Sequence, residues 1–334
     1  MKFHFNRTII LLCMVSWAQG AESDPPPGRQ IAFSDIPMSP AAIAKVIQEG
    51  SGVQVDVFAI PDKPVSMIAK QLSFWQAVER LAEATESRVV TTAGRISLKP
   101  GRSHSPSSVQ GPFRFAVREV LIRGDPETGK SSYILVLDVT WEPQVLAFRI
   151  DSVPKISVAK DESGKAIEIA GGGSRVLTAG NSAELTVRPQ GLNRANKSLS
   201  ISGSVMITIA DEMLTFTFDA ANPTAVSSQK GVAVSVKKHG ADGADWFAVM
   251  EVGSPKSNVN VESYEYALLR NNVVSLLPPK GAAIKANLVE AVDLRYGFKN
   301  MAKQVGPGWK LEYRTSGPLR EIVVPFELKN IPLP

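Results

Sequence analysis

The chain has 334 residues, of which 44% are hydrophobic and 21% charged, the composition of an ordinary globular protein long enough for two or three domains. Lys and Arg total 37 against 32 Asp and Glu, an excess too small to indicate a nucleic-acid-binding protein, which needs cations clustered on one face. Cys13 is the only cysteine. Disulfides are therefore excluded, and everything after Cys13 lacks thiolate metal sites and cysteine nucleophiles.

Residues 1–20 are typical of a Sec signal peptide. Lys2 and Arg7 form the positively charged start, residues 9–17 form the apolar centre, and small residues around Gly20 permit cleavage. The apolar run is shorter than the roughly 20 residues of a membrane-spanning helix. We therefore expect an exported protein with no transmembrane segment after cleavage, located in the periplasm or on the surface of a Gram-negative-type bacterium.

Stretches rich in Pro, Gly or Ser divide the rest of the chain. We predict a Pro-rich tether over 21–29, a linker over 101–111 and a second linker over 221–231. They delimit blocks of domain size, namely 30–100, 112–220 and 232–334.

The first block mixes strand and helix patterns. Alternation over 31–36 predicts a strand, and Ser39 followed by Pro40 predicts the start of a helix. Gly50 and Gly52 are expected to end that helix.

The second half of this block repeats the alternation of strand and helix. Residues 53–60 and 65–72 read as strands, and Ser73 with Gln76 forms a capping box ahead of a second helical stripe. Two short strands around Ala93-Gly94 complete the order β-α-β-β-α-β-β. Such a module packs two helices on one face of a small sheet.

Residues 30–100 resemble the short domain shared by secretins and the N-termini of TonB-dependent transducers, the STN domain. The positions that carry this resemblance are Phe33, Pro37, Ser51-Gly52, Ala77-Val78, Leu81 and Ile96-x-Leu98. The resemblance implies a periplasmic protein-contact module without catalytic activity. The outer-membrane barrel, secretin ring and TonB box that usually accompany the domain are absent from this sequence.

From residue 112 onward, apolar and polar residues alternate almost throughout, in short runs separated by turn signals. This pattern predicts an Ig-like β-sandwich over 112–220 and a second β-rich domain over 232–334. Both blocks loosely resemble β-sandwich modules of uncharacterised exported bacterial proteins. The expected fold class is an α+β module followed by mainly antiparallel β-sandwich domains.

The sequence GDPETGKS at 124–131 matches the phosphate-binding loop of nucleotide hydrolases. Such a loop needs a helix after it, whereas 132–141 alternates and is rich in β-branched residues. Asp125 can start a type I turn, and Gly129 can return the chain into a second strand. We therefore predict a β-hairpin here, with no nucleotide site.

No other pattern predicts a catalytic or metal site. Of the histidines, His104 lies in a predicted linker and His239 follows two lysines, so a Ser-His-Asp triad and a histidine-ligated zinc are not expected. Trp246 and Trp309 follow turns and are the residues expected to make exposed contacts. We predict no cofactor.

Together these patterns predict a non-enzymatic binding or scaffolding protein of the cell envelope, with a partner protein of that compartment. Two alternatives stay open. The β-domains would bind carbohydrate or cell wall if Trp246 or Trp309 flanked a groove. The protein would be a hydrolase with paired carboxylates if a cleft held two acids within catalytic distance.

Overall fold

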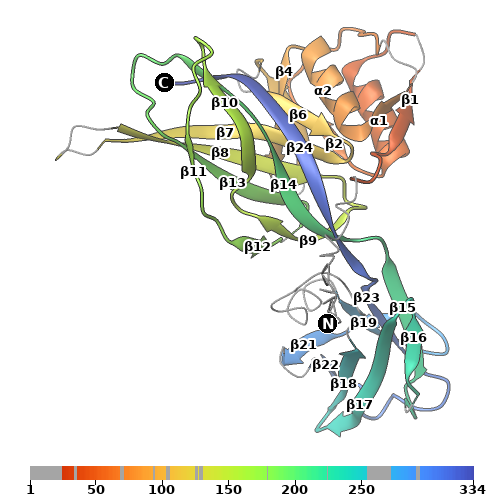
Figure 1. The fold of residues 1–334 in the computed structure, drawn as a ribbon. Coiled ribbons are helices and arrows are strands. Elements are labelled where there is room, and N and C mark those ends of the chain that lie inside the picture. Colours follow the sequence, from red (N-terminus) through yellow and green to blue (C-terminus); the bar gives the residue numbers. More distant parts are fainter. Residues whose placement is uncertain are drawn as a thin grey trace, which may run out of the picture.

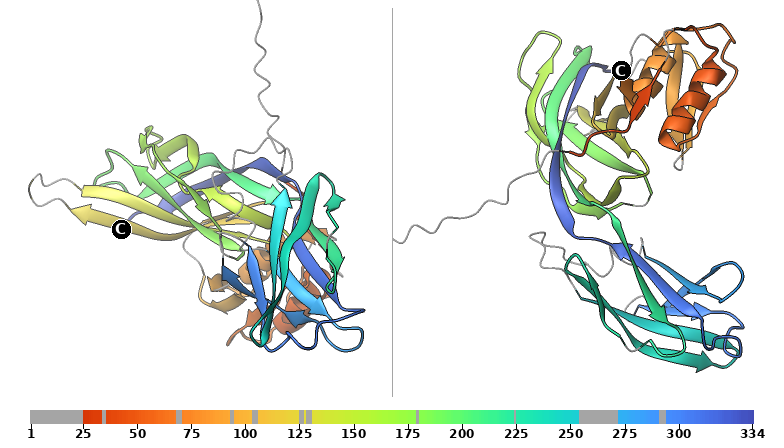
Figure 2. Two further views of the ribbon diagram at one scale, coloured as in Figure 1. Left: turned by 90° about the horizontal axis from the view of Figure 1, so that it is seen from below. Right: turned by 90° about the vertical axis from the view of Figure 1, so that its right-hand side faces the viewer.

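The computed structural model describes residues 25–334, except 34–35, 68–70, 93–94, 103–105, 125–126, 128–130, 179, 224, 254–271 and 291–293. The predicted signal peptide, the start of the tether and the Ala93-Gly94 turn lie outside the described residues. The described chain is mostly β-structure, in several antiparallel sheets, with two short helices. It forms an α/β module and two β-sandwiches, and the first sandwich contacts both other units (Figures 1 and 2).

The two helices of the module begin and end where local signals place them. In α1 (Pro40–Ser51), the Ser39 hydroxyl accepts a hydrogen bond from the Ala42 N–H at 3.3 Å. Gly52 ends this helix at φ 75°, a left-handed conformation that favours glycine. In α2 (Phe74–Ala84), Ser73 and Gln76 form the predicted capping box. Both predicted helix starts are confirmed.

The helices cover small sheets through fully buried apolar residues. Ile43, Ile47, Val78 and Leu81 are each 0% exposed and pack with Leu98 of the sheet. The strands are β2 (Val55–Val57), β5 (Arg95–Pro100) and β4 (Ser87–Thr92) in one sheet, with β1 (Gln30–Ala32) and β3 (Gln71–Ser73) as a separate antiparallel pair. β2 runs parallel to β5, and β4 runs antiparallel to it.

The first sandwich packs two antiparallel sheets around one core. One sheet has the order β11 (Ile169–Ala170), β13 (Ser182–Pro189), β8 (Ser131–Trp141), β7 (Phe113–Gly124), β6 (Ser107–Gln110). The other joins β10 (Lys155–Asp161), β14 (Ser198–Ala210), β9 (Leu146–Asp151), β12 (Arg175–Leu177) and β24 (Leu319–Pro332), which pairs with β14. Leu135 and Leu137 of one sheet meet Ile207 and Val324 of the other, all at 0% exposure.

The second sandwich has its own core. One sheet has the order β15 (Met213–Asp219), β23 (Lys310–Ser316), β19 (Val273–Leu277), β20 (Ile284–Lys285). The other has the order β16 (Ser227–Gln229), β17 (Val232–Asp242), β18 (Asp245–Gly253), β22 (Arg295–Phe298), β21 (Asn287–Glu290). Phe216 and Tyr313 from the first of these sheets meet Val234 and Ala248 from the second, all 0% exposed.

Strand pairing puts the unit boundaries elsewhere than the sequence predicted. β15, from the predicted block 112–220, pairs with β23 in the second sandwich, and β24, from the predicted block 232–334, pairs with β14 in the first. The second sandwich is therefore an insertion between two partner strands. The predicted linkers contain strands β6 and β16, because short polar strands look like linkers in composition.

Two neighbouring segments connect the sandwiches (Figure 1). The Gly317 N–H donates to the Glu212 carbonyl at 3.0 Å, and Arg320 pairs with Asp211 at 2.7 Å. The paired connection constrains the second sandwich more than a single strand of chain would.

The segment 124–131, whose sequence matches a phosphate-binding loop, joins two paired strands. β7 and β8 run antiparallel, with Gly124 opposite Ser131, and Ser131 begins a strand. Most of the turn itself lies outside the described residues. A helix that would present its N-terminus to phosphates does not follow Ser131, so the hairpin prediction is confirmed.

Candidate functional site

The α/β module is fixed to the first sandwich by polar contacts between buried groups. The Trp75 Nε1–H donates to the Pro112 carbonyl at 3.1 Å, and Arg114 pairs with Glu79 at 2.5 Å. The Arg114 side chain is 8% exposed, so this ion pair is shielded from solvent on one side. Removing one partner of such a pair lowers stability more than removing one partner of a surface pair.

The end of the tether also docks on the sandwich. The Arg29 N–H donates to both carboxylate oxygens of Glu142, at 3.1 and 3.3 Å. Gly111 adopts φ 55°, and a Cβ there would lie 2.8 Å from the Pro26 carbonyl oxygen, so this approach requires glycine. With the contacts of Trp75, these bonds set the spacing between module and sandwich.

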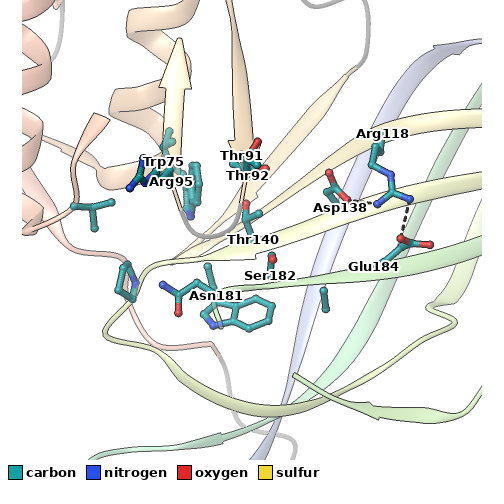
Figure 3. Close-up of a pocket in the computed structure, with 15 residues that line it drawn as sticks. Trp75, Thr91, Thr92, Arg95, Arg118, Asp138, Thr140, Asn181, Ser182 and Glu184 are labelled. Atoms are coloured by element: carbon teal, nitrogen blue, oxygen red, sulfur yellow. Dashed lines mark ion pairs between the residues drawn. The ribbon is translucent and has the colours of Figure 1, made fainter. Parts of the chain in front are cut away.

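A cavity of about 380 Å³ lies at this junction (Figure 3). Thr91, Thr92 and Arg95 line it from the module side, and the outer face of the first sandwich forms the opposite wall. The cavity and its lining residues are here called the junction cleft. The remaining lining residues are Val53, Trp75, Ile96, Arg118, Asp138, Thr140, Trp141, Pro143, Asn181, Ser182, Ala183 and Glu184.

Strand alternation supplies the polar wall of the cleft. In β8, Leu137 and Val139 face the sandwich core, so Asp138 and Thr140 point the other way. β13 pairs with β8 so that Glu184 lies opposite Asp138 and Ser182 opposite Thr140. Two carboxylates and two hydroxyls therefore share one face of two neighbouring strands.

A β-bulge in β7 adds a cation to the two carboxylates. The pairing of β7 with β8 shifts between Val117 and Glu119, which leaves Arg118 as the extra residue. Arg118 lies 2.7 Å from Glu184, 3.5 Å from Asp138 and 3.2 Å from Glu119. One guanidinium thus contacts three carboxylates, of which Asp138 and Glu184 line the cleft. This end of the cleft, here called the acidic end, therefore has two acids and one cation in its lining.

Burial raises the pKa of Asp138 above its ordinary value, although the neighbouring Arg118 acts to lower it. The charge of Glu184 raises this pKa further. Ionised Asp138 is therefore not fully compensated by the protein, which leaves room for a favourable interaction with an additional cation.

The opposite end of the cleft carries an unpaired cation. Arg95 is exposed, and in the part of the chain that the structure describes it has no ion pair. Thr92 lies opposite it in the β4–β5 pairing, and Thr91 also lines the cleft. Figure 3 shows Thr140 and Ser182 between Arg95 and the acidic end, so charge is separated along the cleft.

Two polar atoms of cleft residues lack hydrogen bonds among the described residues. They are Thr140 Oγ1 and Trp141 Nε1, in side chains that are 3% and 2% exposed as whole residues. An unsatisfied buried polar atom costs about 1–3 kcal/mol. Trp141 belongs to the core of the first sandwich, so of the two residues only Thr140 lies on the cleft-facing parity of β8.

The residues expected to make exposed contacts lie far from the junction cleft, in the second sandwich. Trp246 is 4% exposed and packs at ring-centroid distances of 5.7 Å from Phe298 and 6.2 Å from His239. The expected exposure of Trp246 is wrong, because its side chain points to the core side of β18. Trp309 is partly buried against the same core, so neither indole forms an open platform.

Sequence reasoning missed the residues that line the cleft. Asp138 and Thr140 occupy the solvent-facing parity of a predicted strand, where polar residues are ordinary. For Arg118 a sequence signal existed: apolar residues alternate over 113–117, and the alternation resumes one position out of step after Val117. Nothing local shows that the α/β module covers this face.

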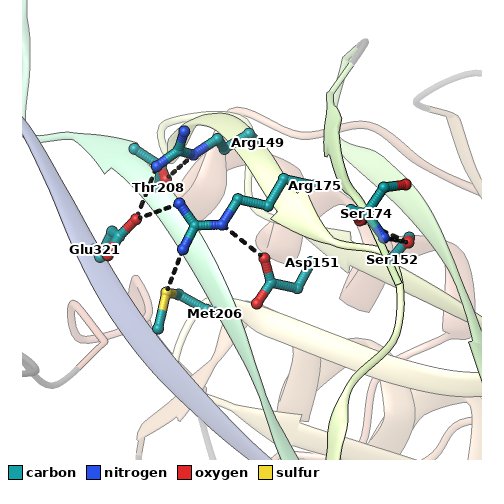
Figure 4. A network of polar contacts seen from close by, with 8 residues as sticks. All are labelled: Arg149, Asp151, Ser152, Ser174, Arg175, Met206, Thr208 and Glu321. Atoms are coloured by element: carbon teal, nitrogen blue, oxygen red, sulfur yellow. Dashed lines mark hydrogen bonds and ion pairs between the residues drawn. The ribbon is translucent and has the colours of Figure 1, made fainter. Parts of the chain in front are cut away.

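A second polar cluster lies on the outer face of the other sheet (Figure 4). Arg149 pairs with Glu321 at 2.8 Å and donates to Thr208 at 2.9 Å, while Arg175 pairs with Glu321 at 3.2 Å and with Asp151 at 3.3 Å. These side chains satisfy one another and tie β24 to β9 and β12. The cluster therefore stabilises the sheet.

Among the described residues, no group of three or more His, Cys, Asp or Glu is placed to hold a metal ion. The described helices are also too short or too polar for any of them to cross a membrane. No known family model, curated protein or solved structure matches the chain.

Proposed function

We propose that this chain is a non-enzymatic binding protein of the bacterial cell envelope, exported by its leader, and that the junction cleft holds a segment of a partner protein. The resemblance of residues 30–100 to STN domains supports a protein-contact role for the module. Within these residues the structure packs two helices against small sheets around one core, which supports a compact module there.

The observation that carries the proposal is a preformed cleft lined by unused polar groups. Contacts of Trp75, Arg114 and Arg29 hold its two walls at a fixed spacing, so little ordering free energy is lost when a ligand enters. Arg95 lacks an ion pair within the described residues, and Thr140 Oγ1 lacks a hydrogen bond there. Convergent polar groups in a concave site are typical of binding sites.

The test is site-specific photo-cross-linking in envelope extract. A photoreactive amino acid replaces Ser182 in the cleft, and as a control it replaces Ser228, an exposed serine on a strand of the second sandwich. We expect one recurring envelope protein to be cross-linked from position 182 and not from position 228. Identical products from both positions, or none from position 182, would contradict the proposal.

One observation favours a second candidate, a carboxylate hydrolase. Asp138 and Glu184 face the same cleft, and burial raises the pKa of Asp138, as expected for a general acid. Against this, the guanidinium of Arg118 contacts both carboxylates and favours their ionised forms. A general acid must instead keep its proton at the working pH.

A panel of 4-nitrophenyl glycosides separates the two candidates. The binding proposal predicts no turnover above that of a Glu184→Gln variant. Turnover that both Glu184→Gln and Asp138→Asn abolish would favour the hydrolase.

Carbohydrate binding has less support than either candidate. It relied on Trp246 or Trp309 flanking a groove, but Trp246 is 4% exposed and Trp309 is partly buried against the core of the second sandwich. Stacking on a sugar needs an accessible ring face.

A further inference from the structure

The acidic end of the junction cleft is suited to a ligand cation. Glu184 is 50% exposed, so its carboxylate stays accessible despite the contact with Arg118. Asp138 lies opposite Glu184 on the neighbouring strand, and Glu119 is the third acid around the same guanidinium. One positive charge cannot neutralise three carboxylates, and an amine placed beside Glu184 would reduce the repulsion among them.

The other end is suited to a ligand anion. Arg95 presents a guanidinium that no described carboxylate occupies, and a guanidinium binds a carboxylate through two parallel hydrogen bonds. Thr92, its partner in the β4–β5 pairing, provides a hydroxyl donor, and Thr91 is a second hydroxyl in the cleft lining. The module and the sandwich thus contribute opposite charges to one cavity.

The middle of the cleft matches amide groups. Thr140 and Ser182 are opposite one another in the strand register, and Asn181 adds a side-chain amide. Hydroxyl and amide side chains both donate and accept hydrogen bonds, as peptide groups do. The volume of about 380 Å³ is near the small end of the roughly 300–1,000 Å³ of ligand pockets, which limits the occupant to a few residues.

We propose that the junction cleft binds a short zwitterionic peptide segment, with an amine at the Asp138–Glu184 end and a carboxylate at Arg95. This inference rests on the proposed function, because it names the ligand of the same site. The two charges come from the ends of a free short peptide or from a basic and an acidic side chain of a partner segment.

Calorimetric titration of the full exported chain tests the inference with small probes. Triglycine carries both charges, N-acetyl-triglycine only the carboxylate, and triglycine amide only the amine. We expect triglycine to bind at least about tenfold more tightly than either blocked form, which corresponds to about 1.4 kcal/mol. A capped acetyl-Lys-Gly-Glu-amide probe identifies the source of the two charges. If it binds more tightly than triglycine, the charges come from side chains of a partner segment. If it binds more weakly, they come from the ends of a free peptide.

Charge-specific variants assign each end of the cleft. Arg95→Gln should weaken triglycine but not triglycine amide, and Glu184→Gln should weaken triglycine but not N-acetyl-triglycine. The matched controls are Arg88→Gln, an exposed arginine of the same β4–β5 hairpin, and Glu168→Gln, an exposed glutamate of the same sandwich. Neither control should change binding.

Equal binding of the three triglycine probes, binding of none of the probes, or binding unaffected by both cleft variants would overturn the inference. If position 182 still gave its specific cross-link in that case, the proposed function would stand and only the ligand class would be wrong. If position 182 behaved like position 228, both proposals would fail.

Discussion

Trp246 shows how a single residue can mislead when its neighbours in sequence are considered alone. It follows a turn, which favoured an exposed indole, but it packs against Phe298 inside the second sandwich. The parity of β18 decides its direction, since Ala248 and Met250 share its face and are also buried. The same reasoning, applied to the parity of β8, would have placed Asp138 on the outer face.

Trp246→Ala is predicted to lower the free energy of unfolding by about 3–5 kcal/mol, the usual cost of truncating a buried large aromatic residue. Trp309→Ala should cost less, because Trp309 is only partly buried. Urea denaturation of both variants measures the difference. Equal, small effects would mean that Trp246 is solvated.

The raised pKa of Asp138 predicts a pH dependence of stability. Because the folded state holds this proton more tightly than the unfolded chain, stability from this group falls as pH rises from the ordinary value of 3.8 through the raised folded pKa. Burial is the main cause of the raised pKa; the charges of Arg118 and Arg114 oppose it, and those of Glu184 and Glu119 add to it. Asp138→Asn should therefore gain stability relative to the natural chain as pH rises through that window.

The measurement is the free energy of unfolding of the natural chain and of the Asp138→Asn variant across the acidic pH range. The difference between the two is followed as a function of pH. Titrating groups that do not interact with Asp138 are common to the two chains and cancel. A difference that is flat with pH, or that falls as pH rises, would contradict the assignment.

At the scale of elements, the sequence predicts what depends on neighbours in the chain. The starts of α1 and α2 follow from Ser39-Pro40 and from Ser73 with Gln76, because capping uses residues three apart. The β7–β8 hairpin follows from alternation around a short turn. The bulge at Arg118 was not predicted: the alternation is offset after Val117, but the shift in register itself depends on the partner strand.

Ser73→Ala is predicted to destabilise the module by about 1 kcal/mol, because the hydroxyl accepts a hydrogen bond from the Gln76 N–H at 3.4 Å. Gln76→Ala should act on the same cap, so the two changes together should cost less than their sum. Thermal unfolding of the single and double variants tests the coupling. Strict additivity would show that the capping box contributes nothing as a unit.

At the scale of the whole molecule, the sequence predicts a β-rich, multidomain chain but not how the chain divides. β14 and β24 pair along almost their whole lengths, yet the second sandwich lies between them in sequence. Alternation shows that a segment is a strand but not which distant strand it pairs with. The sequence pattern therefore predicts a single domain for residues 232–334. The junction cleft was invisible for the same reason, since its walls meet only through docking of the module.

A fragment of residues 213–316 is predicted to fold cooperatively, because it contains the whole second core. A fragment of residues 232–334, cut at the boundary that the sequence suggested, should not, because it lacks β15 and exposes β24. Circular dichroism and urea denaturation of the two fragments compare them. Cooperative folding of the second fragment alone would contradict the observed pairing.

Hydrogen–deuterium exchange of the chain with and without its cross-linked partner tests most directly whether the junction cleft is the binding site. The account predicts slower amide exchange in β4 and β5 of the module and in residues 181–184, with no change in the second sandwich. Slower exchange confined to the second sandwich, or unchanged exchange around the cleft, would contradict it.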